Sequence, residues 1–277
     1  MQLNYLYFTT YFKMLFINIL YMTLVPQPAP RELTDNKFQT LKDVTSFYSD
    51  NSFSFKEKHK FIYDTFKANL SSIETTIRAN KCQGYGEAPF FWSWYLLIKE
   101  MSSNFSFLEI GVYKGKVMAS VQLIAMSLNK QCNIVGISPL ADVGDKYSKY
   151  NSSDFLSDIQ TGYANSGITF DNTKIIKEYS QNLAALNESK DYGPYDIVYI
   201  DGCHDYDVVC QDIDNYLPLL KPTGFLVMDD ASSLIQDPYG VFVGHADVAR
   251  AVKDKLDNNN EVQHLFAIGH NRVWRKK

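Results

Sequence analysis

The sequence has no excess of basic residues, since 27 Lys and Arg stand against 31 Asp and Glu for a net charge of −4. Proteins that bind nucleic acid or an anionic membrane surface usually show a basic patch or a basic balance. The composition therefore gives no reason to expect a nucleic-acid partner. It has 45% hydrophobic and 21% charged residues, as an ordinary globular protein does.

Cysteine is scarce, and its spacing argues against a disulfide framework and against a zinc site. The four cysteines are scattered, with no C-x-x-C pair, so they do not form the dense disulfide framework of a small secreted domain. We therefore expect reduced thiols and a cytoplasmic protein. Cys203, His204 and Cys210 lie close in sequence, but their spacing fits no zinc pattern, and a buried cysteine at a strand end is common.

Charge is nearly absent from residues 1–30, where Lys13 is the only charged side chain. The apolar run "MLFINILYMTLV" is interrupted by Asn18 and is too short for a comfortable membrane span. A secretory signal would need a basic first part and a clear cleavage site. We expect a poorly ordered N-terminal extension over 1–30 and no stable membrane span. A signal or anchor segment is the alternative.

Residues 31–101 have a helical pattern. Apolar residues recur at three- and four-residue spacing through 35–50 and 55–80, and 86–101 reads as one more amphipathic helix with an aromatic inner face. We expect a helical region packed on the core. The aromatic stretch "PFFWSWY" suits core packing, with lining of an acceptor pocket as a second use.

From 102 to 277 short apolar strands alternate with helices, which is typical of βαβ units. The pattern predicts an α/β domain with a Rossmann-like, doubly wound, mostly parallel sheet and an antiparallel C-terminal edge. The strands are expected at 105–112, 133–138, 174–179, 195–202, 224–230, 264–269 and 271–276. In such sheets ligands bind beyond the carboxyl ends of the strands.

The first strand runs into the turn "EIGVYKG", with Glu109, Gly111, Tyr113 and Gly115. Glycines let the backbone turn sharply and approach a ligand. A dinucleotide fingerprint needs G-x-G-x-x-G, which this spacing does not match. The acid before the first glycine suits a positively charged ligand better than a diphosphate.

Three segments carry a family resemblance: "FLEIGVYKGK", "YDIVYIDGCHDYDVVCQDI" and "YLPLLKPTGFLVMDD". Their order along 105–256 resembles that of class I S-adenosylmethionine-dependent methyltransferases. More narrowly, they are similar to the metal-dependent group that includes the macrocin and mycinamicin sugar O-methyltransferases and, more distantly, catechol O-methyltransferase.

The resemblance implies that Gly111 and Gly115 wrap the methionine part of the cofactor, with Glu109 supporting the loop and Tyr113 lying between the glycines. The second strand usually ends in an acid that holds the ribose, but here Ser138 stands there. A serine cannot supply a charged bidentate acceptor, so either affinity is lower or Asp142 substitutes. Ser180 and Gln181, in "EYSQNLA", are implied near the adenine.

Asp201 follows directly on one apolar strand, and Asp229 and Asp230 follow directly on the next. These two strands are expected to be neighbours in the sheet. Converging carboxylates repel one another unless a cation or protons neutralise them. Hard oxygen ligands suit Mg²⁺, with other divalent cations as substitutes. The resemblance implies that the metal binds the acceptor hydroxyl. The alternative is that Asp229 or Asp230 caps a turn.

His204 lies three residues after Asp201, at the position of a proposed general base in the sugar methyltransferases that the sequence resembles. A neutral imidazole near pH 7 can accept the hydroxyl proton. The alternative is that His204 caps the next helix, where Asp205 and Asp207 suit the first turn. His245 and His270 are not assigned a role.

We therefore predict transfer of a methyl group from S-adenosylmethionine to a hydroxyl of a small molecule or sugar, assisted by a divalent metal. Asp201 and His204 are the predicted catalytic residues, and Asp201 also belongs to the cofactor site. A nicotinamide-dependent oxidoreductase and a non-catalytic methyltransferase-like binding module are the rival interpretations. Association into a homo-oligomer stays open.

Overall fold

A computed structural model describes residues 37–70, 73–235 and 240–277 of the chain. Asn36–Lys277 form one compact unit. The prediction for residues 1–30 lies outside the described residues. Among those that are described, no helix is both long and apolar enough to cross a membrane.

Among the described residues, four helices precede the first strand: α2 (Leu41–Ser49), α3 (Phe55–Asn69), α4 (Glu74–Arg78) and α5 (Ala88–Glu100). Local chemistry sets two of their starts. Thr40 with Asp43, and Ser54 with Glu57, form reciprocal capping boxes at α2 and α3. Pro89 occupies the first turn of α5, where a missing N–H costs nothing.

The rest of the chain alternates strands and helices. The strands are β1 (Asn104–Ile110), β2 (Gln131–Ile137), β3 (Thr173–Ile176), β4 (Tyr195–Ile200), β5 (Leu220–Met228), β6 (Val262–Ile268) and β7 (Asn271–Lys276). The helices are α6 (Lys116–Ser127), α7 (Phe155–Asn165), α8 (Leu183–Tyr192), α9 (Tyr206–Tyr216) and α10 (Ala246–Lys255), with the short 3₁₀ turn η2 (Leu217–Leu219).

The seven strands form one sheet in the order β3-β2-β1-β4-β5-β7-β6. The first five strands pair in parallel, and β7 pairs antiparallel with both β5 and β6. This confirms the predicted Rossmann-like, mostly parallel sheet with an antiparallel C-terminal end. The last strand, β7, lies inside the sheet between β5 and β6, so β6 forms the edge.

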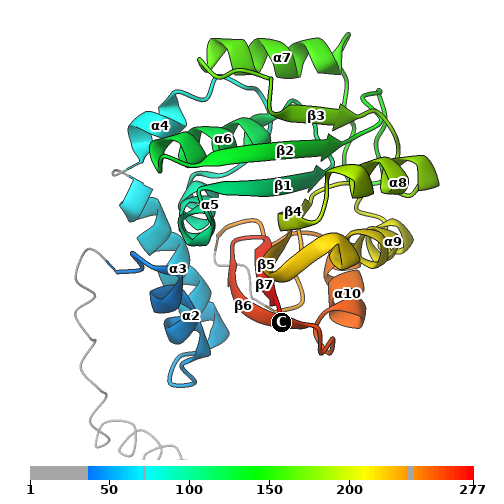
Figure 1. Ribbon diagram of the computed structural model, residues 1–277. Helices are drawn as coiled ribbons and strands as arrows, with labels where there is room; N and C mark the ends of the chain where they lie inside the picture. The colour runs from blue at the N-terminus through cyan, green and yellow to red at the C-terminus, as the bar shows by residue number, and fades with distance from the viewer. Residues whose placement is uncertain (1–36, 71–72, 236–239) are drawn as a thin grey trace, which may run out of the picture. The chain divides into compact units, whose positions relative to one another are not determined.

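Side chains alternate between the two faces of the sheet and build two hydrophobic cores. On one face Phe107, Ile134 and Phe225 pack with α2, α3, α5 and α6. On the other, Leu108 and Val198 belong to the core that includes residues of α8, α9 and α10. Figure 1 shows the two groups of helices on opposite sides of the sheet. This three-layer arrangement leaves the strand ends open for a site.

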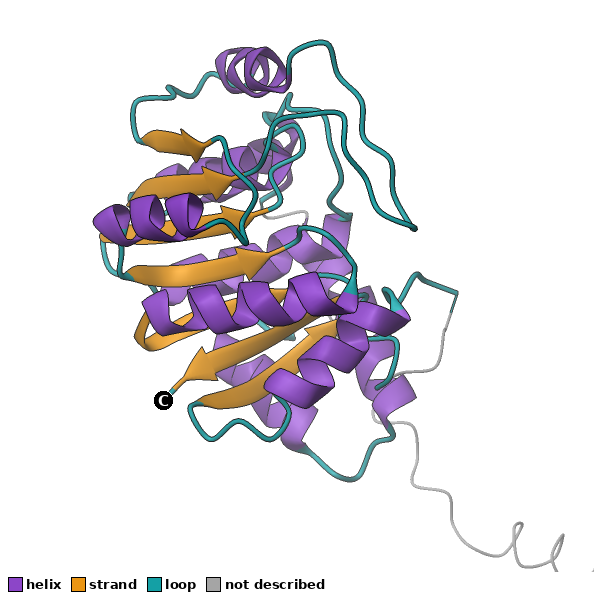
Figure 2. Cartoon of the chain, turned by 90° about the vertical axis from the view of Figure 1, so that its right-hand side faces the viewer, coloured by secondary structure: helices purple, strands orange, loops and turns teal. Residues whose placement is uncertain are grey.

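Strand order reverses between β1 and β4, because β2 and β3 lie to one side of β1 while β4 and β5 lie to the other. Ligands of open α/β sheets bind in the crevice at this reversal, beyond the carboxyl ends of the strands. Figure 2 shows loops gathered beyond the arrowheads of the parallel strands.

Candidate active site

A cavity of about 580 Å³ lies beyond the carboxyl ends of the parallel strands. Residues that follow β1, β2, β4 and β5 line it, including Val112, Ser138, Asp201 and Asp229. The cavity therefore lies at the strand-order reversal. Of the predicted site residues, Glu109 and Gly115 are not part of the lining, and all the others are: Gly111, Tyr113, Ser138, Ser180, Gln181, Asp201, His204, Asp229 and Asp230.

Gly111 and Gly115 are glycines because of the protein's own packing. Both have left-handed backbone, with φ of 95° and 77°. A Cβ on Gly111 would lie 1.8 Å from the carbonyl oxygen of Asp201, and one on Gly115 would lie 2.9 Å from Ile159 Cγ2. Gly111 thus lets the turn after β1 touch the end of β4. Gly115 is the N-cap of α6.

Glu109 is buried in β1 with 3% exposure. Burial and the charge of Asp229 raise the pKa of Glu109 to about 8, although the N–H of Met118 acts in the opposite direction. Its Oε2 atom is buried without a hydrogen-bond partner. Glu109 is therefore a neutral carboxyl near pH 7 that stands behind the cavity wall.

Tyr113 belongs to an aromatic group at the cavity. Its ring stacks on Tyr85 with centroids 5.6 Å apart, and it lies 5.1 Å from Tyr150 and 6.0 Å from Phe155. All four rings line the cavity. They provide large flat surfaces on the side of the first glycine turn.

Ser138, at the end of β2, is buried and uses its polar atoms locally. Its N–H donates to Ile176 O at 3.2 Å, and its Oγ accepts from Leu140 N at 3.3 Å. Asp142 accepts a hydrogen bond from Ser152 N at 2.9 Å. Ser138 lines the cavity, whereas Asp142 is exposed and does not belong to the lining.

Asp201, at the end of β4, contacts Asp229, at the end of β5. Tyr199 donates its hydroxyl to Asp201 Oδ2 at 3.0 Å. Burial and the charges of Asp229 and Asp230 raise the pKa of Asp201, while a hydrogen bond joins its carboxyl to that of Asp229. Of the two carboxyls, Asp201 is therefore the one whose protonated form is favoured.

Asp229 also pairs with His270, from the turn between β6 and β7. His270 Nε2 lies 3.3 Å from Asp229 Oδ1. Burial raises the pKa of Asp229, but the charge and hydrogen bond of His270, together with the hydrogen bond to Asp201 and the charge of His204, leave this pKa lowered. Burial lowers the pKa of His270, but Asp229 outweighs it and raises that pKa to about 9. The pair is an imidazolium–carboxylate pair.

Asp230 lies between two other histidines. Its Oδ2 is 3.0 Å from His204 Nε2 and 3.5 Å from His245 Nε2. Asp230 has left-handed backbone with φ of 53°, a conformation that Asp tolerates better than most side chains. Its carbonyl accepts from His245 N at 3.0 Å, so the start of α10 holds this turn in place.

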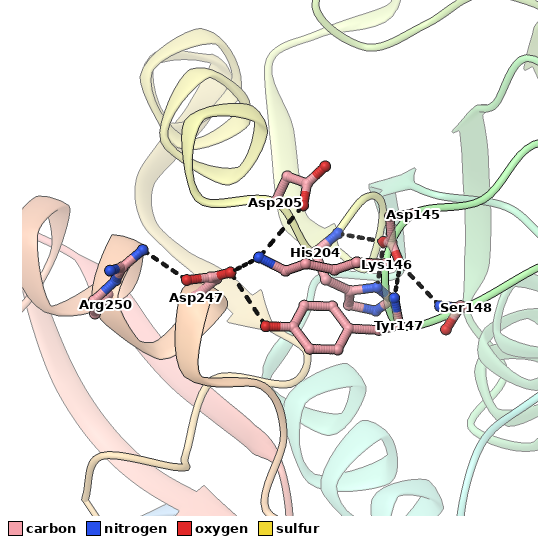
Figure 3. A network of polar contacts seen from close by, with 8 residues as sticks. All are labelled: Asp145, Lys146, Tyr147, Ser148, His204, Asp205, Asp247 and Arg250. Atoms are coloured by element: carbon pink, nitrogen blue, oxygen red, sulfur yellow. Dashed lines mark hydrogen bonds and ion pairs between the residues drawn. The ribbon is translucent and has the colours of Figure 1, made fainter.

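His204 is fixed by Asp145, from the loop that follows β2 (Figure 3). Asp145 Oδ2 lies 2.6 Å from His204 Nδ1 and accepts from His204 N at 2.8 Å. The other oxygen accepts from Tyr147 N and Ser148 N. Burial raises the pKa of Asp145, but these backbone donors outweigh it and leave the pKa at about 2. Asp145 is therefore a carboxylate that holds Nδ1–H and turns Nε2 toward Asp230.

The same loop is tied to the starts of α9 and α10. Lys146 pairs with Asp247 and lies 3.7 Å from Asp205, while Tyr147 donates its hydroxyl to Asp247 at 3.1 Å (Figure 3). Asp205 is the N-cap of α9 and Asp207 lies in its first turn, in line with the expected helix-start positions. The Tyr147 ring stacks on His245 with centroids 4.1 Å apart.

The residues present can hold a divalent cation. Among residues 37–70, 73–235 and 240–277, two groups have possible ligand atoms within 4.8 Å of one another: His204 with Asp230 and His245, and Asp229 with Asp230 and His270. Asp201 belongs to neither group. Asp229 Oδ1 is buried, lies 3.3 Å from His270 Nε2, and makes no further hydrogen bond among the described residues, so it has a lone pair left for a cation. Carboxylate oxygens suit Mg²⁺, and added imidazole nitrogen suits Mn²⁺ or Zn²⁺.

Sequence reasoning missed Asp145, His245 and His270. The sheet order places His270, because an antiparallel β7 beside β5 brings the start of β7 next to the end of β5. Arg272 pairs with Met228 in this register, and Ala231 N donates to His270 O at 2.8 Å. Asp145 lies in an irregular loop, and no sequence signal places it.

Residues 108–231, less than half of the chain, match the family model of a methyltransferase domain. Uncharacterized protein R132 of Acanthamoeba polyphaga mimivirus is 29% identical over 130 residues, which are 46% of this chain and 52% of that protein. The chain thus spans about half the length of this curated relative.

Solved structures share the fold at low identity. An SAH-bound Podospora anserina methyltransferase, PaMTH1, has a TM-score of 0.50 and 13% identity, covering 88% of this chain and 99% of its own. An O-methyltransferase from Bacillus cereus in complex with SAH has a TM-score of 0.49 and 12% identity, with coverages of 80% and 98%. MycE, a methyltransferase of the mycinamycin biosynthetic pathway solved in complex with Mg, SAH and mycinamycin VI, has a TM-score of 0.44 and 17% identity. The match covers 75% of this chain and 53% of MycE.

Proposed function

We propose that the chain transfers a methyl group from S-adenosylmethionine to a hydroxyl oxygen of a small molecule or sugar, with the assistance of a divalent metal. One observation carries this proposal: a single cavity lies at the strand-order reversal. Carboxylates and histidines line one part of it, and glycine, serine and glutamine residues line another. The methyltransferase-domain match over residues 108–231 supports the same activity.

In this proposal the cofactor occupies the side of the cavity formed by Gly111, Tyr113, Ser138, Ser180 and Gln181. Glu109 and Gly115 act from behind the wall, since neither lines the cavity. Gly115 starts α6, and the aromatic group around Tyr113 offers flat surfaces to the cofactor. Asp201 lies between the two ends and belongs to both.

His204 is the proposed general base. Asp145 holds Nδ1–H, so Nε2 is the nitrogen that accepts a proton. The acceptor oxygen attacks the methyl carbon, the C–S bond pair returns to sulfur, and the hydroxyl proton passes to His204 Nε2. Burial lowers the pKa of His204, but Asp230 outweighs it and raises this pKa above its usual range. The reaction requires the neutral imidazole, whereas this raised pKa favours the protonated form; a cation bound at Asp230 would offset the carboxylate charge and favour the neutral form.

Asp201, Asp229 and Asp230 are the proposed metal ligands. Asp229 and Asp230 form a group with His270, and Asp201 adjoins this group through its hydrogen bond to Asp229. When bound, the cation would act as a Lewis acid that lowers the pKa of the acceptor hydroxyl and would neutralise the carboxylates. Their burial supports this role, because Asp229 and Asp230 expose 12% and 9% of their side chains.

The acceptor is proposed to lie beside this end of the cavity, between aromatic rings. Phe90 contacts the His270 ring edge-on at 4.6 Å, and Phe242 lies 5.2 Å from both His245 and His270. Of the aromatic stretch on α5, Phe90 lines the cavity, whereas Trp92 and Trp94 are core residues. Flat apolar rings suit the C–H face of a sugar or a planar acceptor.

His204→Ala tests this proposal. Turnover with a panel of hydroxyl acceptors and radiolabelled S-adenosylmethionine should fall by roughly 10²–10⁴, the usual span for a general base, while binding of S-adenosylhomocysteine is kept. Unchanged turnover removes His204 from the mechanism.

A further inference from the structure

Asp212 is a buried carboxyl behind the cavity wall, and the proposed mechanism does not use it. It lies on α9 and is 1% exposed. Its Oδ2 is 3.7 Å from the place that a Cβ on Gly202 would take, and this oxygen is buried without a hydrogen-bond partner. A buried carboxyl without compensation destabilises a fold, so its presence at this place calls for a physical reason.

Asp212 receives donors from the segment that follows β3. Gln181 Nε2 donates to Asp212 Oδ1 at 3.2 Å and to Ser180 Oγ at 2.5 Å. Ser180 also forms a side-chain hydrogen bond with Asp212. Tyr216, one turn further along α9, donates its hydroxyl to Ser180 O at 2.7 Å. Two residues of α9 thus hold the backbone and the side chains of this segment.

These contacts fix which way round the Gln181 amide lies. A glutamine amide has two N–H donors and one carbonyl acceptor. Asp212 and Ser180 take both donors, so the carbonyl oxygen Oε1 is the group that Gln181 has left to offer. Gln181 lines the cavity, so Oε1 is the acceptor that this side chain can offer to a ligand there.

We propose that Asp212 is a positioning residue that sets the cofactor specificity of the cavity: by holding the Gln181 amide, it makes the site select a nucleoside with an exocyclic amine over its carbonyl analogue. The inference rests on the proposed use of S-adenosylmethionine, whose adenine carries a 6-amino group. A 6-oxo purine would place a carbonyl against Gln181 Oε1 and leave both acceptors unpaired.

The protonation state of Asp212 does not reverse this effect. Burial raises the pKa of Asp212 to about 7, against the lowering effect of Ser180 and Gln181. A proton on Oδ2, the oxygen without a partner, leaves Oδ1 as an acceptor for Gln181. Gln181 therefore keeps the same orientation in both forms.

The experiment compares binding of S-adenosylhomocysteine with binding of its 6-oxo analogue, S-inosylhomocysteine, by calorimetry. The unmodified protein should prefer the 6-amino ligand by on the order of 10- to 100-fold, the effect of an unpaired buried polar group. D212L keeps the branching and the number of side-chain heavy atoms and removes both acceptors, so the Gln181 amide can turn over and the preference should fall about tenfold or more.

Three further variants complete the test. D212N keeps an acceptor oxygen and should keep the preference. D214N is the matched control on the same helix, because Asp214 is exposed and pairs with Lys255 at the surface; it should behave as the unmodified protein. Q181A removes the acceptor itself and should abolish the preference even if D212L does not fold.

A folded D212L or Q181A protein that keeps the full preference overturns the inference. Failure of the unmodified protein to bind either thioether would instead contradict the proposed function. The two failures are therefore distinguishable.

Discussion

Asp145 Oδ2 lies 2.6 Å from His204 Nδ1, although 59 residues separate the two in the sequence. The loop after β2 thereby reaches the end of β4 and fixes the orientation of the imidazole. This relationship distinguishes a positioned base from a histidine that only caps α9. A helix-capping role would not need a carboxylate held by three backbone donors.

The first prediction concerns this carboxylate. D145N should lower the turnover number by roughly 10²–10³, because the amide can stabilise the wrong tautomer of His204. The affinity for S-adenosylhomocysteine should change little. Steady-state kinetics with saturating cofactor measure the effect. K149A, an exposed position on the same loop, is the control and should leave turnover unchanged. Equal turnover in D145N and K149A would show that Asp145 does not act through His204.

The second prediction concerns the cation. After dialysis against EDTA, methyl transfer should stop and should return with Mg²⁺ or Mn²⁺. Electron paramagnetic resonance of added Mn²⁺ should show binding to the unmodified protein that D229N and D230N weaken by at least about tenfold, since each removes a charged ligand. D207N, an exposed acid in the first turn of α9, should bind Mn²⁺ normally. Activity that EDTA does not affect would rule out the metal.

The third prediction is a pH dependence of stability that arises from Glu109. Its pKa is about 8 in the folded protein, against an ordinary value of 4.5. The folded state therefore holds a proton that the unfolded state has lost, and the free energy of unfolding falls as pH rises between these values. The fall from this one group is up to about 5 kcal/mol.

E109Q should remove that part of the slope. Urea denaturation in EDTA at about pH 5 and about pH 9 measures it: the unmodified protein should lose more stability than E109Q across this interval. If both lose the same amount, Glu109 does not carry the proton.

Much of the fold was predictable because short apolar runs alternate clearly with period-3.6 patterns after residue 102. Asp201, Asp229 and Asp230 were predicted to converge from their positions directly after neighbouring apolar strands, and the contact between Asp201 and Asp229 agrees with that expectation. The insertion of β7 between β5 and β6 was not predicted, because two short antiparallel strands fit either order by pattern alone.

The contacts of His204 and His270 could not be predicted from the sequence. His270 contacts Asp229 only because β7 pairs with β5, and Asp145 reaches His204 only through the path of an irregular loop. Neither relationship has a local sequence period. The burial of Asp212 could not be predicted for another reason. It lies on an amphipathic helix rich in acids, and nothing in the sequence distinguishes it from exposed neighbours such as Asp207 and Asp214.

The central claim is that the cavity binds S-adenosylmethionine, and calorimetry tests it most directly. Titration of the protein with S-adenosylhomocysteine and, separately, with NAD should give binding of the thioether and none of the dinucleotide. Binding of NAD without binding of S-adenosylhomocysteine would contradict the account.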